Sequence, residues 1–174
     1  AGMYLVDLKK WREEKVEDKI IKRIHEQNGN VFFFEQTLMN WSCSGKILQL
    51  PPKYNAYTLF WAFTYKNLIC WRKPNAFYLE SEVEEAKDNP IIIHFTRNFY
   101  MLSRPWIKWC DHPKTKEYVK YKLLTPWKQL EEDNRSKKSI RRYKLWHIIP
   151  QRILAIGAGV IYNEVRPKLW WKNE

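Results

Sequence analysis

The first long pattern in the chain is helical, because apolar residues recur every three or four positions after Asp7. The Asp7 carboxylate can cap the start of this helix, and Asn28-Gly29-Asn30 supplies a stop signal after it. We therefore predict a helix between Asp7 and Asn28. Its apolar face consists of Leu8, Trp11, Val16, Ile20, Ile21 and Ile24.

Short apolar runs outside this helix predict buried strands. Met3–Val6 reads as a strand, Val31–Phe34 is a second apolar run, and Lys46–Leu50 reads as a strand that Pro51-Pro52 ends. Ile91–Ile93 gives a further buried strand. Because the opening strand has no turn chemistry before it, we expect that the chain does not open at a natural N-terminus.

Helical segments alternate with these strands, which is the arrangement of α/β proteins. A short helix is predicted from Glu35 to about Trp41, and Ser81 followed by Glu84 reads as a capping box for another helix. Residues 57–73 are rich in aromatic side chains and fit either a helix or a strand. The fold class predicted from this order is α/β.

The pattern changes in the later part of the chain, where aromatic and basic residues interleave. A helix is predicted from Thr115 to Leu124, and residues 128–138 form a charged connector. Residues 139–149 and 151–162 then read as two amphipathic or apolar helices that Pro150 separates. The chain is therefore expected to end in a helical appendage.

Composition indicates a folded chain with an anionic partner. The chain has 174 residues, and its ten Trp, ten Tyr and eight Phe exceed what so small a core encloses. Its 31 Lys and Arg against 19 Asp and Glu give a net charge of +12, which favours phosphate, nucleic acid or an anionic membrane as partner. Residues 121–174 hold 12 basic and 5 acidic residues, so most of the excess charge lies there.

The cysteine pattern is typical of a reducing compartment, because Cys43, Cys70 and Cys110 are odd in number and widely spaced. This spacing fits neither a disulfide framework nor a zinc site. The longest nearly unbroken apolar run, Ile153–Tyr162, is shorter than the about 20 residues of a membrane-spanning helix. We expect a cytoplasmic protein without a spanning helix.

Four segments carry a family resemblance by their order and spacing. Ala1–Arg12 looks like an Asn-Ala-Gly strand and a Leu-Lys-Lys-Trp helix, without the Asn. Glu35–Asn40 is similar to Asp-Gln-x-x-Leu-Asn, with Glu in place of Asp, and Leu50–Asn55 looks like Leu-Pro-x-x-Tyr-Asn. Asn89–Phe95 followed by Arg104–Trp106 is similar to a His-Phe signature and a Lys-Pro-Trp signature, and this pairing is the most specific signal.

Together these segments resemble glycosyltransferase family 8, a retaining, metal-dependent group that includes bacterial lipopolysaccharide glucosyl- and galactosyltransferases. The resemblance covers about residues 1–110 and implies the C-terminal part of a GT-A fold. Residues 1–127 would belong to the catalytic domain, and residues 128–174 would form a basic, aromatic tail. The family's Asp-x-Asp motif and nucleotide-binding strand lie upstream of this half, so we expect the isolated chain to be inactive.

The resemblance implies that His94 binds Mn²⁺ or Mg²⁺ together with the Asp-x-Asp pair that this sequence lacks. Arg104 would grip the phosphates of a nucleotide sugar donor in place of the family's Lys, and Ala1, Gly2 and Arg97 lie in the other donor-binding segments. Two alternatives stay open. His94 also fits a core histidine bonded to the backbone, and Arg104 also fits a surface arginine stacked on a tryptophan.

Glu35 and Gln36 would lie beside the anomeric carbon of the transferred sugar, as the resemblance implies. A carboxylate there could stabilise positive charge on the sugar ring, and an amide could hold its hydroxyl groups. The alternative for Glu35 is an acidic residue at a helix N-terminus that the helix dipole favours.

The tail carries a candidate membrane surface, because cations, aromatic residues and aliphatic residues mix in it as in an interfacial helix. The resemblance agrees, since related bacterial enzymes dock on the inner membrane through such a tail. The alternative is a solvated helix that packs one apolar face on the core. The candidate membrane residues are Arg141, Arg142, Lys144, Trp146, Trp170 and Trp171.

The sequence therefore predicts a retaining transferase that moves a hexose from a nucleotide diphosphate sugar, with UDP as the expected nucleotide, to a lipopolysaccharide or capsular glycan. The expected location is peripheral, on the inner face of the cell membrane. One alternative is an inactive fragment that serves as a membrane-associated interaction module. A basic nucleic-acid-binding protein is the other, but no nucleic-acid motif supports it, so we expect no such partner.

Overall fold

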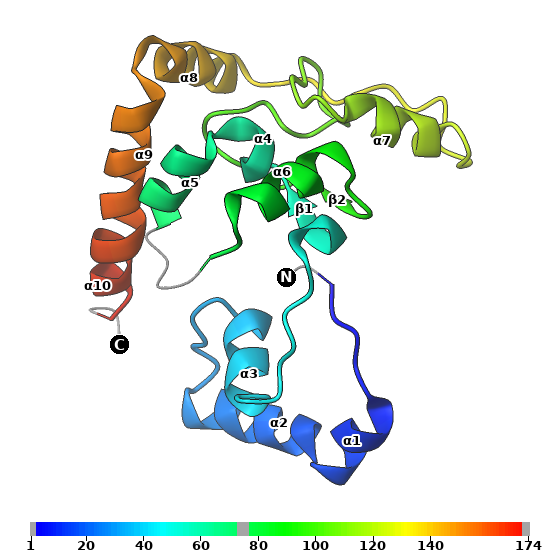
Figure 1. The fold of residues 1–174 in the computed structure, drawn as a ribbon, viewed down its shortest axis with the longest axis vertical. Coiled ribbons are helices and arrows are strands. Elements are labelled where there is room, and N and C mark those ends of the chain that lie inside the picture. Colours follow the sequence, from blue (N-terminus) through cyan, green and yellow to red (C-terminus); the bar gives the residue numbers. More distant parts are fainter. Residues whose placement is uncertain (1–2, 73–76, 172–174) are drawn as a thin grey trace. The chain divides into compact units, whose positions relative to one another are not determined.

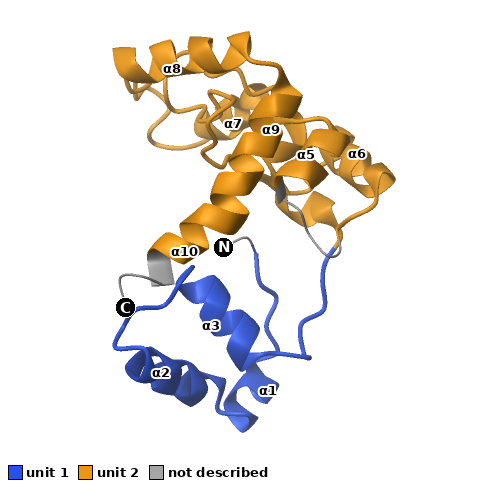
Figure 2. Cartoon of the chain, turned by 90° about the vertical axis from the view of Figure 1, so that its left-hand side faces the viewer, with its two compact units in different colours: residues 1–50 blue, residues 51–174 orange. Residues whose placement is uncertain are grey.

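The computed structural model describes residues 3–72 and 77–171, except for the side chains of Arg72, Trp170 and Trp171 (Figure 1). The chain divides into two compact units, unit 1 (Ala1–Leu50) and unit 2 (Pro51–Glu174) (Figure 2). The boundary expected between residues 127 and 128 lies inside unit 2. The division into a catalytic part up to residue 127 and a basic tail from residue 128 stays a prediction.

Unit 1 is helical in its described part. Its elements are α1 (Leu8–Glu13), α2 (Val16–Glu26) and α3 (Glu35–Ser42). The Asp7 carboxylate accepts hydrogen bonds from the amides of Lys9 and Lys10 at 3.0 and 3.1 Å, which confirms the predicted cap. The predicted helix at Glu35 is also confirmed.

The single helix predicted after Asp7 is divided into two pieces. Lys15 adopts a left-handed backbone with φ of 49°, which ends α1 and starts α2 in a new direction. Asn28 and Gly29 have positive φ of 48° and 80°, so the predicted stop signal is confirmed. The apolar run Val31–Phe34 that follows forms tight turns.

The strands predicted at Met3–Val6 and Lys46–Leu50 are wrong. Both segments lack strand structure, and their apolar side chains are largely exposed, as shown by Leu5 at 91% and Leu48 at 87%. A strand needs a neighbour that pairs its backbone N–H and C=O groups. The described residues of unit 1 contain no strand that could act as one.

Unit 2 combines helices with a small sheet. Its elements are η1 (Pro52–Asn55), β1 (Ala56–Tyr57), α4 (Leu59–Ala62), α5 (Tyr65–Arg72), α6 (Glu80–Asp88), β2 (Ile93–His94), α7 (Thr115–Lys122), α8 (Lys137–Ile148), α9 (Gln151–Val160), the π-helix η2 (Ile161–Val165) and α10 (Arg166–Trp171). The α/β class is therefore present, with helices predominating among the described residues. The ambiguous stretch 57–73 contributes β1, α4 and α5.

The sheet consists of β1 and β2 in parallel, with Ala56 opposite Ile93 and Tyr57 opposite His94. The strand predicted at Ile91–Ile93 therefore begins later and extends to His94. The cause lies in the backbone of η1, because the Lys53 carbonyl accepts hydrogen bonds from the two amides that precede β2 at 2.9 and 3.1 Å.

The capping box predicted at Ser81 and Glu84 is wrong in position. α6 begins at Glu80, and the Glu82 carboxylate accepts a hydrogen bond from the Leu79 amide at 2.7 Å. Glu84 instead forms an ion pair with Lys87 at 2.7 Å. The helix therefore starts earlier than the Ser-x-x-Glu pattern indicates.

The core of unit 2 lies between α4, α5, α6 and α9. Aromatic rings surround it, and the Phe63 ring lies 5.4 Å from Trp71 and 5.3 Å from Tyr100. Burial of this apolar surface supplies the main stabilisation of the unit. The most deeply buried hydrophobic members are Ala56, Phe60, Leu68, Val83, Ala86 and Ala155.

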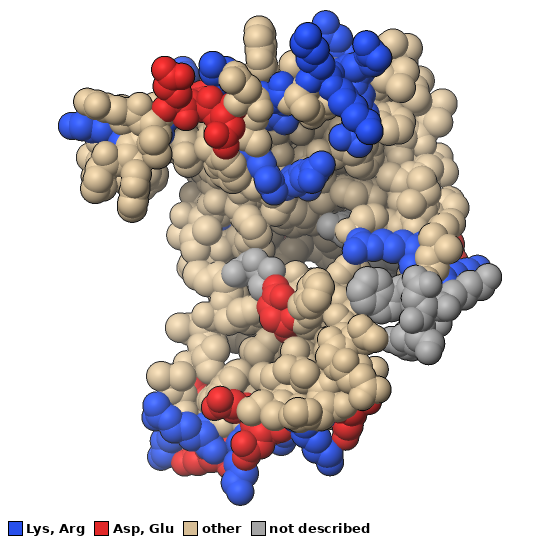
Figure 3. Space-filling model, turned by 180° about the vertical axis from the view of Figure 1, so that it is seen from behind, with Lys and Arg blue, Asp and Glu red and all other residues tan. Residues whose placement is uncertain are grey.

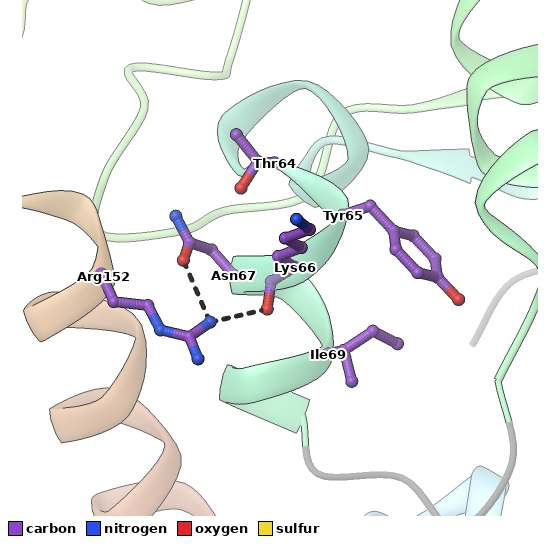
Figure 4. Close-up of a pocket in the computed structure, with 6 residues that line it drawn as sticks. All are labelled: Thr64, Tyr65, Lys66, Asn67, Ile69 and Arg152. Carbon is purple, nitrogen blue, oxygen red and sulfur yellow. Dashed lines mark hydrogen bonds between the residues drawn. The ribbon is translucent and has the colours of Figure 1, made fainter.

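The first turn of α9 is bonded to α5. The Arg152 guanidinium donates hydrogen bonds to the Lys66 carbonyl at 3.1 Å and to Asn67 Oδ1 at 3.5 Å (Figure 4). Asn67 Nδ2 donates to Gln151 Oε1 at 2.7 Å. An open cavity of about 510 Å³ lies beside these bonds, but its arginine is already engaged by protein groups. These contacts hold α9 along α5.

The predicted C-terminal helices are confirmed as α7, α8 and α9, with Pro150 between the last two. Ser136 caps α8, because its hydroxyl oxygen accepts a hydrogen bond from the Ser139 amide at 3.2 Å. No single helix in the described part of the chain is long and apolar enough to cross a membrane. By length and composition alone, α8 and residues 151–169 are together long and apolar enough to cross a membrane, as a helix pair bent by 112° at the break between them.

Two glycines of α9 predict opposite responses to alanine. A Cβ at Gly159 would lie 3.1 Å from the carbonyl oxygens of Cys70 and Trp71, which belong to the backbone of α5 and cannot move aside easily. A Cβ at Gly157 meets nothing within 4 Å. We expect Gly157→Ala to raise the free energy of unfolding by about 0.5–1 kcal/mol, and Gly159→Ala to lower it by about 1–3 kcal/mol. Urea unfolding measures both, and equal gains would contradict the close packing of α9 on α5.

Candidate functional site

The candidate site of unit 2 is centred on His94, the last residue of β2. His94 Nδ1 lies 3.1 Å from Oδ1 of Asn55, which immediately precedes β1. Because the amide oxygen is an acceptor, we assign the ring proton to Nδ1. Nε2 then keeps its lone pair, which is the arrangement of a metal-binding histidine held by a hydrogen bond at its other nitrogen.

The backbone around His94 is fixed by two neighbouring threonines. The His94 carbonyl accepts hydrogen bonds from the amides of Thr58 at 3.2 Å and Thr96 at 2.7 Å. Thr58 is fully buried. Among the described residues, the ring of His94 bonds to a side chain and not to the backbone, which differs from the core-histidine alternative.

Burial lowers the pKa of the half-buried His94 below its usual value. The imidazole is therefore neutral at pH 7, which is the protonation state that binds a metal ion. Groups of three or more His, Cys, Asp or Glu side chains that could hold a metal ion are absent among the described residues. His94 can thus supply one ligand, and a complete metal site needs others.

Arg104 lies in the segment after β2 and is half-buried. Its guanidinium carbon lies 5.6 Å from the centre of the Trp106 ring, so the stacking alternative describes its present conformation. Its Nε atom is buried without a hydrogen-bond partner among the described residues. Arg97 is exposed in the same segment.

Glu35 and Gln36 lie in unit 1, at the first turn of α3, and both are exposed. This position also fits the helix-dipole alternative. His94, Arg97 and Arg104 lie in unit 2, whereas Glu35 and Gln36 lie in unit 1. Ala1 and Gly2 lie outside the described residues.

Sequence reasoning missed His112, a buried residue next to this site. The residue is 3% exposed, and its ring lies between Phe95 and Trp61, with ring centres 4.8 and 4.9 Å away. Nδ1 accepts a hydrogen bond from the Lys114 amide at 3.1 Å. Burial first and the Lys114 charge second lower the pKa of His112 to about 4. The only signal in the sequence was the position of the residue in an aromatic segment.

The candidate membrane residues of α8 divide between two faces. The Trp146 ring packs edge-on against Phe99, with ring centres 5.9 Å apart, as in the alternative of a helix that packs on the core. Arg141, Arg142 and Lys144 are exposed. In the face drawn in Figure 3, basic side chains gather over the end of unit 2 that contains α8. The side chains of Trp170 and Trp171 lie outside the described part.

Comparison with known proteins gives a family match over much of this chain. The model of glycosyl transferase family 8 matches residues 1–110. This range includes the first turn of α3, both strands of the sheet and Arg104. No solved structure matches significantly.

Three curated relatives differ in how much of the chain they cover. Lipopolysaccharide 1,2-glucosyltransferase of Escherichia coli (strain K12) is 30% identical over 93% of this chain and 44% of its own length. General stress protein A of Bacillus subtilis (strain 168) is 25% identical over 73% of this chain and 41% of its own. A putative glycosyltransferase of Haemophilus influenzae (strain ATCC 51907 / DSM 11121 / KW20 / Rd) is 31% identical over 42% of this chain and 23% of its own length. The chain therefore spans less than half the length of these relatives.

His112 predicts a loss of stability in acid. Its pKa is lower in the folded protein, at about 4, than its ordinary value of 6.5, so the neutral ring stabilises the fold above pH 6.5. This contribution, roughly 3 kcal/mol, is lost as the pH falls from 6.5 towards 4. We expect His112→Asn to flatten the pH dependence of the unfolding free energy in this range. The matched control is His25→Asn, which changes an exposed histidine. If His112→Asn leaves the pH dependence of the unfolding free energy unchanged, the role assigned to His112 is wrong.

Proposed function

The chain belongs to glycosyl transferase family 8, and we propose that it forms part of an enzyme that transfers a hexose from a nucleotide diphosphate sugar to a lipopolysaccharide or capsular glycan. Membership implies a GT-A-like α/β fold. The observation that carries the proposal is the family match over residues 1–110, which includes the candidate metal-binding, donor-binding and sugar-contacting residues of both units. UDP as the nucleotide and retention of configuration are parts of the proposal.

The role proposed for His94 follows from its hydrogen bond to Asn55. That bond orients the ring and leaves Nε2 as the donor atom for Mn²⁺ or Mg²⁺. A divalent cation supplies stabilisation of the charge that develops on the leaving diphosphate. Since His94 is one ligand, we propose that the others come from an Asp-x-Asp motif outside this sequence.

Arg104 is proposed to contact the diphosphate. Its planar guanidinium can bind two phosphate oxygens at once. The buried, unpartnered Nε shows that hydrogen-bonding capacity is left in this side chain among the described residues. Contact with phosphate would turn the guanidinium from the Trp106 face towards the donor. Arg97 is proposed as an auxiliary cation in the same segment.

Glu35 and Gln36 are proposed to act on the sugar. A carboxylate stabilises positive charge at the anomeric carbon, and an amide orients the ring hydroxyls. Both residues are exposed at the first turn of α3. Ala1 and Gly2 are proposed to belong to the donor-binding part of the same enzyme.

The basic tail is proposed to hold the enzyme on the inner face of the cell membrane, where a lipid-linked acceptor is available. The match to the Escherichia coli relative supports a shared tail, because 93% coverage of this chain includes most of residues 128–174. α8 carries five cations and exposes the apolar side chains of Leu145 and Ile148. This combination suits an anionic surface.

The metal role of His94 predicts a large effect of its removal. In the enzyme that contains this chain, we expect His94→Ala to lower metal-dependent transfer by more than about 100-fold, and Asn55→Ala by about 10–100-fold through loss of ring orientation. His25→Ala, which changes an exposed histidine of α2, should leave transfer unchanged. Steady-state assays with Mn²⁺ measure all three. Wild-type activity in His94→Ala would remove this residue from the site.

The tail predicts binding to anionic vesicles. We expect the chain to float with vesicles of phosphatidylglycerol and phosphatidylcholine but not with phosphatidylcholine alone. At about 1 kcal/mol for each cation, the double change Arg141→Ala and Arg142→Ala should weaken binding by roughly 30-fold. The matched control changes Lys9 and Lys10, two exposed lysines of unit 1, and should bind as the wild type does. Equal binding to neutral vesicles would contradict an electrostatic membrane surface.

A further inference from the structure

A cavity of about 380 Å³ lies between α7 and the segment that follows it. Such a volume falls within the about 300–1,000 Å³ of small-molecule sites. Four of its lining residues are aromatic, and two are carboxylates. The lining residues are Trp106, Tyr118, Tyr121, Lys122, Thr125, Trp127, Leu130, Glu131 and Asp133.

The walls of the cavity are held by hydrogen bonds within unit 2. The segment after α7 doubles back along the chain (Figure 1), where the Lys108 amide donates to the Asp133 carbonyl at 2.9 Å and the Asp133 amide donates to the Trp106 carbonyl at 3.0 Å. The Leu130 amide donates to the Trp127 carbonyl at 3.0 Å. The cavity is therefore formed before any ligand enters, which lowers the entropy cost of binding.

Aromatic side chains of this cavity are open to solvent. Trp127 and Tyr121 are each 64% exposed, so a ligand can reach both rings, and the Lys120 ammonium lies 5.9 Å from the centre of the Tyr121 ring. Trp106 and Tyr118 pack on each other with ring centres 6.0 Å apart and form a fixed part of the wall. Exposed aromatic rings beside polar groups suit a ligand with one apolar face and a polar edge.

The charges of the cavity select against an anionic ligand. Glu131 and Asp133 line it and can accept hydrogen bonds from hydroxyl groups. Its one lining lysine, Lys122, already donates a hydrogen bond to the Leu130 carbonyl. A neutral polyol ring, with C–H groups on its face and hydroxyls at its edge, satisfies both the aromatic and the carboxylate groups.

We propose that this cavity is a carbohydrate-binding subsite that holds one pyranose ring of a glycan, with Trp127 and Tyr121 against the ring face and Glu131 accepting hydroxyl hydrogen bonds. As a place for the acceptor glycan the subsite rests on the proposed function. Binding of a sugar to this cavity does not rest on the proposed function, because it needs neither a nucleotide sugar donor nor a metal ion. The cavity borders the Arg104 region, because Trp106 lines it and the Arg104 guanidinium lies 5.6 Å from the centre of the Trp106 ring.

The test is a titration of the 174-residue chain with maltose and with lactose, observed through the tryptophan indole resonances by NMR. We expect saturable shifts of the Trp127 indole with at least one disaccharide, and none with mannitol, an open-chain polyol without a ring face. Trp127→Ala should weaken binding by about tenfold or more, and Trp127→Phe should retain most of it. Glu131→Gln should weaken binding by about fivefold.

The matched control is Trp109→Ala, which removes an exposed tryptophan outside the cavity and should bind as the wild type does. No indole shift with either disaccharide would overturn the subsite, as would equal affinity in Trp127→Ala. Displacement of the sugar from these rings by uridine would instead identify a nucleobase site and also overturn it. A chain that binds sugar while the intact enzyme lacks transfer would refute the proposed function alone.

Discussion

The pairing of β1 with β2 is the constraint on which the candidate site depends. It joins Ala56 to Ile93 and Tyr57 to His94 across a long interval of sequence, and it places Asn55 beside the His94 ring. The fully buried Ala56 fixes this pair to the core of α4, α5 and α6. Since cores are packed as densely as crystals, the backbone of this strand pair is held in place, and the hydrogen bond to Asn55 orients the half-buried His94 ring.

The helices were predictable because their signals are local. Asp7 caps α1, Asn28 and Gly29 stop α2, and Pro150 separates α8 from α9, as the sequence indicates. Of the predicted strands, Ile91–Ile93 is found in shifted form as β2 and the runs at Met3–Val6 and Lys46–Leu50 are not strands, because an apolar run forms a strand only where a partner strand is available. Met3–Val6 has the right composition for a strand and stays unpaired among the described residues.

Only those residues of the site that a sequence motif singled out were predictable. The resemblance singled out His94, but the partner that orients its ring, Asn55, stood at the end of a different motif with no role assigned to it. The burial of His112 between Phe95 and Trp61 depends on three segments that meet only in the folded unit. The aromatic cavity at Trp127 likewise required the return of the chain after α7, which no local pattern encodes.

The most direct test of the account is pulsed electron paramagnetic resonance on Mn²⁺ bound with uridine diphosphate to the enzyme that contains this chain. The account predicts modulation from the nitrogen of one coordinated imidazole, and its loss in His94→Ala. Absence of nitrogen modulation in the wild type would contradict the account. Modulation that persists unchanged in His94→Ala would contradict it equally, because another residue would then be the ligand.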